Sequence, residues 1–186
     1  FRVTCLERTA VDLACLLGYE RAVALIDAAL HAGADPVVLN RMVVNAKRRH
    51  GIGTVRAALA FADRLSESPG ESISRVRMAE VGLPAPRLQV NIFDENGIWV
   101  ARTDFGWLDR GVVGEFDGLV KYVGSPEEVA RAVMREKTRE AAIRRLGWGV
   151  ARWNWQDLAD RRAFHSLIEA AFDQASNRIR GHAEPA

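Results

Sequence analysis

Three carboxylates in the second half of the chain have the types and the spacing of residues that bind a metal ion. Asp104 lies near the end of one predicted strand, and Glu115 and Asp117 lie at the end of the next, two residues apart and therefore on one face. The residues around Glu115 and Asp117 in the second of these strands are mostly apolar. An ionised carboxylate in such surroundings is costly unless it is paired or holds a cation. Carboxylate oxygens suit a hard divalent cation, so the pattern favours Mg²⁺, or Mn²⁺ in its place.

Two lysines follow these acids in the sequence. Lys121 comes just after the strand that carries Glu115, and Lys137 falls on a stripe of a predicted helix that should face the sheet. A lysine beside metal-bound carboxylates positions or deprotonates an attacking water, or stabilises charge on a phosphate oxygen. The simpler alternatives are a solvated loop cation at Lys121 and, at Lys137, a side chain that extends along the helix edge to water.

The acids have structural interpretations as well. Asp104 and Glu115 could cap turns or pair with Arg102 or Arg110, and the Asp-Gly dipeptide at 117–118 is a turn signal. These alternatives need no metal ion. The apolar flanks of the strand favour the metal site over them.

The elements that must position these residues alternate between helices and strands. Hydrophobic periodicity and turn signals predict, in order, a helix, three strands, a long helix, a strand and a helix, over residues 71–81, 88–93, 98–105, 112–116, 126–146, 150–153 and 155–179. Ser125, Pro126 and the two acids that follow are a strong start for the long helix. Because the strands before and after this helix are joined by a helical crossover, they should be parallel. The expected fold class is α/β, of order αβββαβα, with a mixed central sheet flanked by helices.

Residues 1–65 are predicted to form a small helical bundle instead. Its clearest helix start is Asp35 followed by Pro36, a cap before a first-position proline. Clustered serine, proline and glycine at 66–70 break the helical period and mark a boundary. The predicted organisation is a helical domain over 1–65, a second domain over 66–180 and a flexible tail over 181–186.

The composition is that of a folded globular chain. Of 186 residues, 48% are apolar and 27% are charged, and a formal net charge of +2 permits nucleic-acid binding without requiring it. No run reaches the roughly 18 to 20 apolar residues of a membrane span, and no charged-then-apolar leader opens the sequence, so we expect a cytoplasmic protein without a membrane partner. The first residues read like the interior of a protein, so a segment before Phe1 is expected.

Several motifs together resemble a known family. The segments Arg102–Trp107, Glu115–Gly118, Leu146–Trp148 and Arg152–Leu158 are similar to the DUF559 and very-short-patch-repair-like branch of the PD-(D/E)XK nuclease superfamily. The resemblance implies a restriction-endonuclease-like core over about 67–178. The segment Val3–Ala14 resembles the linker of actinobacterial AbiEi-type antitoxins, in which a winged-helix domain usually precedes it; that domain is absent from this sequence.

The resemblance implies roles for particular residues. Asp104 corresponds to the metal-binding aspartate, Glu115 to the acid of the D/E-X-K motif, and Glu71 to the acid that often completes the metal site from the preceding helix. Asp117 stands where the motif has lysine, which leaves open whether Lys121 or Lys137 takes that role. The implied activity is Mg²⁺- or Mn²⁺-dependent hydrolysis of DNA, in repair or defence.

The displaced lysine also supports a second hypothesis. An AbiEi-like protein that has lost catalysis would be a DNA-binding regulator, as a homodimer or with a toxin partner. Five cations are candidates for DNA backbone contact: Arg75, Arg77, Lys47, Arg48 and Arg49. For the last three the structural alternative is stabilisation at a helix C-terminus, and for Glu71 it is a favourable first-turn position.

Overall fold

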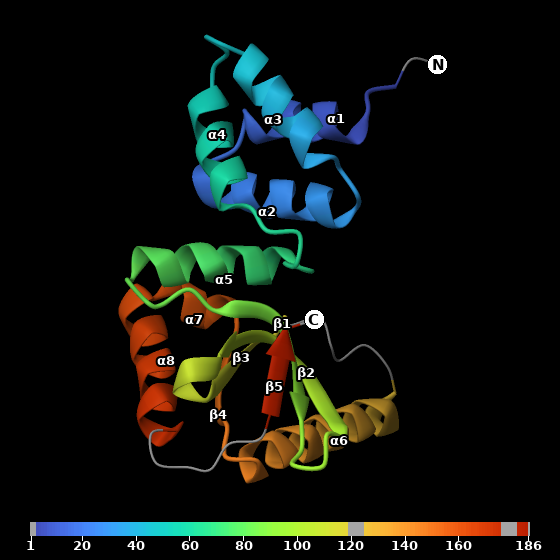
Figure 1. Cartoon of the computed structure of the whole chain (residues 1–186), viewed down its shortest axis with the longest axis vertical. Helices are drawn as coiled ribbons and strands as arrows, with labels where there is room; N and C mark the ends of the chain where they lie inside the picture. Colours follow the sequence, from blue (N-terminus) through green and yellow to red (C-terminus); the bar gives the residue numbers. More distant parts are fainter. Residues whose placement is uncertain (1–2, 119–124, 176–181, 186) are drawn as a thin grey trace. The chain divides into compact units, whose positions relative to one another are not determined.

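The computed structural model of this chain describes residues 3–118, 125–175 and 182–185. By its internal contacts the chain divides into two compact units, Phe1–Val76 and Arg77–Ala186. Both units contain helices, and the second contains the sheet (Figure 1). Within the described residues, no helix is long and apolar enough to cross a membrane.

The first unit is helical, as predicted. It contains α1 (Leu6–Ala14), α2 (Tyr19–His31), α3 (Pro36–Asn45), α4 (Ile52–Phe61) and the start of α5 (Pro69–Glu80). Asp35 caps α3, since its carboxylate accepts a hydrogen bond from the backbone N–H of Val37 at 2.7 Å, and Pro36 is the first helical residue. Gly51 precedes α4 with a φ of +77°, and a Cβ there would lie 2.0 Å from the carbonyl oxygen of Cys15. Only glycine fits this position.

The helix α5 ties the predicted start of the second domain to the first unit. Val76 belongs to the apolar cluster of the bundle, which includes the fully buried Ile26 and Leu39. Arg75 pairs with Asp27 of α2 at 2.9 Å. The division therefore falls inside α5 and not at the composition shift near 66, because this helix supplies buried contacts to the bundle.

The second unit is built on a five-stranded mixed sheet of order β4-β3-β2-β1-β5 (Figure 1). The strands are β1 (Arg87–Phe93), β2 (Trp99–Trp107), β3 (Val112–Phe116), β4 (Gly149–Trp153) and β5 (His182–Pro185). β3 and β4 are parallel, and the other neighbouring pairs are antiparallel. This confirms the α/β class and the predicted crossover. Residues 182–185, predicted as a flexible tail, instead pair with β1, and no local pattern in the sequence shows this long-range pairing.

Helices cover both faces of this sheet. Val150 and Trp153 are three residues apart in β4, so they lie on opposite faces. Val150 packs in a cluster with Ile143 of α6 (Pro126–Arg145). Trp153 packs edge-on against Phe164 of α8 (Arg161–Ala175), with ring centroids 5.5 Å apart. The sheet is therefore sandwiched between α6 and α8.

The connections follow the predicted signals in part. Ser125 and Glu128 form a reciprocal capping box at the start of α6. A short 3₁₀ turn, η1 (Leu108–Arg110), joins β2 to β3. The helix predicted over 155–179 is interrupted, because Asp160 is extended and its carboxylate accepts hydrogen bonds from the N–H groups of Arg162 and Ala163. The result is two helices, α7 (Trp155–Ala159) and α8.

Candidate functional site

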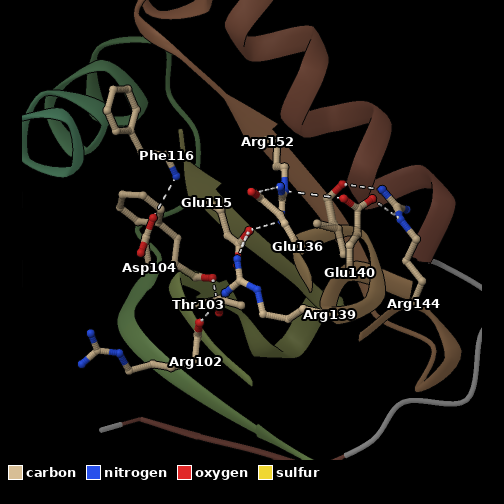
Figure 2. Close-up of polar contacts among 12 residues, drawn as sticks. Arg102, Thr103, Asp104, Glu115, Phe116, Glu136, Arg139, Glu140, Arg144 and Arg152 are labelled. Carbon is tan, nitrogen blue, oxygen red and sulfur yellow. Dashed lines mark hydrogen bonds and ion pairs between the residues drawn. The ribbon is translucent and has the colours of Figure 1, made fainter. Parts of the chain in front are cut away.

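The structure brings Asp104 and Glu115 onto neighbouring strands, as predicted. The β2–β3 register pairs Phe105 with Gly114, so Asp104 and Glu115 come next in line. One carboxylate oxygen of Asp104 accepts a hydrogen bond from the backbone N–H of Phe116 at 2.9 Å (Figure 2). The paired residues of β2 and β3 end at Phe105 and Gly114, so the Asp104 side chain extends the contact between the strands.

Glu115 is held by two guanidinium groups. It is 6% exposed and lies opposite Arg152 in the parallel β3–β4 register. Nη2 of Arg152 donates to Oε2 of Glu115 at 2.5 Å, and Nη2 of Arg139 donates to the same oxygen at 3.0 Å and lies 2.9 Å from Oε1 (Figure 2). Two positive charges therefore contact a single buried carboxylate, which is the pairing that burial demands.

These pairs belong to a larger network that joins β3, β4 and α6. Arg152 also pairs with Glu136 and, at 3.5 Å, with Glu140. Glu140 in turn pairs with Arg144 at 2.7 Å. Together with Arg139 and Glu115, this makes three carboxylates and three guanidiniums, so the formal charges balance. Burial lowers the pKa of Arg152, but the three nearby carboxylates outweigh it and raise the pKa above its usual value.

The described side chains do not fit a Mg²⁺ or Mn²⁺ ion in this arrangement. Within the described ranges, no three His, Cys, Asp or Glu side chains are grouped so that they could hold a metal ion. Oε2 of Glu115 accepts hydrogen bonds from both Arg139 and Arg152, and these two guanidiniums would repel a divalent cation placed there. Asp117, the third predicted ligand, is half-buried just after β3, where its N–H donates to the carbonyl of Trp153 at 2.8 Å.

Glu71 serves the start of its own helix in the first unit. Its carboxylate accepts hydrogen bonds from the backbone N–H of Glu67 at 3.0 Å and from the hydroxyl of Ser68 at 2.7 Å. The Ser68 hydroxyl accepts a hydrogen bond from the Glu71 N–H at 3.2 Å. This reciprocal cap corresponds to the helix-start interpretation of Glu71, and the metal role implied by the resemblance stays a prediction.

The two candidate lysines have different outcomes. Lys121 lies outside the described residues. Lys137 is exposed on α6, so the prediction that it faces the sheet is wrong. Positions of α6 that contact the sheet include Arg139 and Glu140, with Ile143 fully buried. The helix face predicted to contact the sheet is therefore the wrong one. Charged residues of α6 face the sheet and pair there with other charged residues, whereas hydrophobic periodicity assigns charged residues to water.

Arg75 and Arg77 do not have the geometry of phosphate ligands. The guanidinium of Arg75 pairs with Asp27 and also donates to the backbone carbonyl of Phe61 at 2.6 Å. It lies 4.8 Å from the centre of the Phe61 ring, and only 12% of the Arg75 side chain is exposed. Arg77 is equally buried and pairs with Glu80 at 2.5 Å. Each guanidinium pairs with a carboxylate of its own unit, and the predicted contact of Arg75 and Arg77 with DNA stays a prediction.

The basic run at 47–49 lies in the turn that follows α3, which ends at Asn45. The run therefore follows the helix C-terminus directly and does not form the last turn of the helix. Arg49 pairs with Asp12, and hydrogen bonds from Arg8 and Arg49 lower the pKa of this aspartate. Lys47 and Arg48 are exposed, and they remain the members of the run that are open to a phosphate.

The sequence interpretation missed the charged network itself. Arg152 lies in a short strand between the buried residues Ala151 and Trp153. A charged residue in such surroundings needs an oppositely charged partner, and this is the signal that could have revealed the network. The pairs with Glu115 and Glu136 span 37 and 16 residues, so no helical or strand spacing identifies them.

Comparisons with known proteins give relatives without a described role. The chain is 36% identical over 144 residues to two uncharacterized proteins of Mycobacterium tuberculosis, Rv2248 of strain H37Rv and MT2308 of strain CDC 1551. The match covers 76% of this chain and 51% of each relative, so the chain spans about half the length of the curated relatives it matches. No protein-family model matches the chain, and no solved structure matches it.

Proposed function

We propose that this chain is a DNA-binding regulator of the AbiEi antitoxin type, in which a restriction-endonuclease-like domain has a structural acid centre in place of a catalytic one. The order of helices and strands in the second unit, with β3 and β4 parallel, supports the proposed domain. The observation that carries the loss of catalysis is the pairing of Glu115 with both Arg139 and Arg152.

The energetics of this pairing oppose metal binding at Glu115. A cation that recruited Glu115 would leave Arg139 and Arg152 without this carboxylate, and 24% of the Arg152 side chain is exposed. Because Arg152 keeps Glu136 and Glu140 as partners and Arg139 is partly exposed, the loss of this carboxylate should cost about 1–3 kcal/mol. Metal binding must offset this cost before it stabilises any state of the site.

Exposed cations supply the proposed contact with DNA. Lys47 and Arg48 are exposed in the first unit, and Arg131, Arg135 and Lys137 are exposed along α6 in the second. Such side chains bind phosphates without reading the base sequence, and they release counterions when they do so. The expected binding is therefore strongly dependent on salt and independent of divalent metal.

The test is binding of a labelled duplex to the full chain, by fluorescence anisotropy in EDTA and in Mg²⁺ or Mn²⁺, with gel analysis of the same samples. We expect equal affinity in both buffers and intact DNA. The double variant Lys47→Ala/Arg48→Ala should reduce the slope of affinity against salt by up to about 2, because two phosphate contacts are lost. Metal-dependent cleavage that Asp104→Ala abolishes would contradict the proposal.

A metal-dependent endonuclease is the second candidate, and one observation favours it. Asp104 and Glu115 lie next to each other on neighbouring strands, as the resemblance implies for the acids of a nuclease. The gel assay separates the two candidates directly. Cleavage by the wild type and by a surface control such as Glu95→Gln, but not by Asp104→Ala, would establish the nuclease.

A further inference from the structure

An open groove of about 650 Å³ lies between the start of β2 and α6. Its lining includes Trp99, Val100, Arg131, Met134, Arg135 and Arg139. Most of the surface area that lines the groove is apolar, although three of these six side chains are arginines. The acid network described above uses only Arg139 from this set.

The apolar side of the groove consists of large side chains that are open to solvent. Trp99 is 56% exposed and Met134 is 66% exposed. The indole N–H of Trp99 donates to the side-chain oxygen of Asn91 at 3.2 Å, which fixes the orientation of the ring. Single exposed apolar residues are normal on a protein surface, but here two of them line one hollow beside arginines.

The charged side of the groove has a surplus of positive charge. Arg131 and Arg135 are exposed and are four residues apart, about 6 Å along the helix axis. In the described parts of the chain, no carboxylate pairs with either guanidinium, and Arg131 donates instead to the carbonyl of Glu127. The nearby Glu136 and Glu140 contact Arg152. An occupant of this groove should therefore be anionic and should also have a flat apolar face.

We propose that this groove binds unpaired nucleotides of single-stranded DNA. A base stacks on the indole of Trp99 and against Met134, while adjacent phosphates contact Arg131 and Arg135. Stacking platforms next to arginines are how proteins bind single strands with little sequence preference. The inference rests on the proposed function in that the partner is DNA and that Arg131 and Arg135 contact phosphates, but Trp99 and Met134 have no part in that function. It predicts a preference for DNA that contains unpaired bases.

The test compares a fluorescein-labelled oligothymidylate with a fully paired duplex, using the full chain in EDTA. Trp99→Ala should weaken oligothymidylate binding about tenfold, because one stacked base is lost, and should change duplex binding less than twofold. Ile98→Ala is the matched control, since Ile98 is 63% exposed, precedes Trp99 and does not line the groove. Trp99→Phe should retain most of the binding because it keeps an aromatic face.

Each outcome decides the inference. If Trp99→Ala and wild type bind oligothymidylate equally, the groove does not stack a base, while duplex binding keeps the proposed function intact. If the wild type binds neither form of DNA, both proposals fail. Displacement of the oligothymidylate by oligoglutamate at equal charge would assign the groove to acidic peptides and overturn the inference. Asn91→Ala, which frees the indole without removing it, should weaken single-strand binding less than Trp99→Ala does.

Discussion

Each unit of this chain buries a carboxylate against arginine, but the two carboxylates are held by different kinds of partner. Asp27 is fully buried and contacts one guanidinium together with the backbone N–H of Asp63 at 2.8 Å. Its partner Arg75 also donates to a backbone carbonyl. Glu115 contacts two guanidiniums on long side chains, and 35% of the Arg139 side chain is exposed.

The difference shows which pair can rearrange. The groups that hold Asp27 include backbone atoms, which move only if the helices and the loop move. Arg139 and Arg152 can change rotamer while the strands stay in place. Asp27 is therefore a fixed structural pair, and the network around Glu115 is where a ligand could alter the second unit. Four predictions test this comparison.

The largest effect is expected from Arg75→Ala in the first unit. This change leaves Asp27 buried without its cation, which should lower the free energy of unfolding by about 3–5 kcal/mol. All five tryptophans belong to the second unit, so tryptophan fluorescence follows that unit alone, and far-UV circular dichroism, to which the helices of both units contribute, is needed to detect unfolding of the first. Arg56→Ala, an exposed arginine of α4, should change stability by less than about 0.5 kcal/mol. Equal effects of the two variants would contradict the structural role.

A smaller effect is expected from Glu115→Gln in the second unit. Arg152 keeps Glu136 and Glu140 as partners, so the loss should be about 1–3 kcal/mol. Tryptophan fluorescence during urea unfolding measures it, with the exposed Glu95→Gln as control. A loss as large as that of Arg75→Ala would show that the network is as rigid as the Asp27 pair.

The pH dependence should have opposite signs at two aspartates of the first unit. Burial raises the pKa of Asp27 and outweighs its hydrogen bonds and the nearby Arg75, while hydrogen bonds from Arg8 and Arg49 lower the pKa of Asp12. The folded state therefore binds the proton of Asp27 more tightly than the unfolded state does, and this contribution to stability falls as pH rises above about 4. The contribution of Asp12 is present above about pH 4 and is lost as the pH falls below it.

Unfolding measured by circular dichroism at several pH values checks both signs. The wild type should lose stability as the pH rises above about 4 because of Asp27, and Asp27→Asn should abolish this loss. It should lose stability as the pH falls below about 4 because of Asp12, and Asp12→Asn should abolish that loss. A wild-type profile that neither variant alters would show that these aspartates titrate alike in the folded and unfolded states.

The smallest effect on stability is expected from Arg139→Gln, because this side chain is partly exposed and Glu115 keeps Arg152. Its value lies in metal binding. With one of the two guanidiniums removed, Mn²⁺ should bind more tightly than to the wild type in calorimetric titration. Arg135→Gln, one turn earlier on α6, is the control. Unchanged Mn²⁺ affinity in Arg139→Gln would contradict the argument that arginine excludes the metal.

The sequence by itself determined the local features of this protein. Asp35 before Pro36 and the capping box at Ser125 specify helix starts, because each hydrogen bond joins residues no more than three apart. The short connection between two successive strands predicts that Asp104 and Glu115 lie near one another, and the helical crossover predicts that β3 and β4 are parallel.

Only the tertiary structure decided the partners of the charged residues. The bonds from Glu115 to Arg139 and Arg152 span 24 and 37 residues, and the bond from Arg75 to Asp27 spans 48. The sequence does not distinguish a charged residue that faces water from one that faces a buried opposite charge. For this reason the sequence pattern does not show that Lys137 faces water and that Arg139 faces the sheet. Burial creates the need for a partner, and the fold alone brings one within reach.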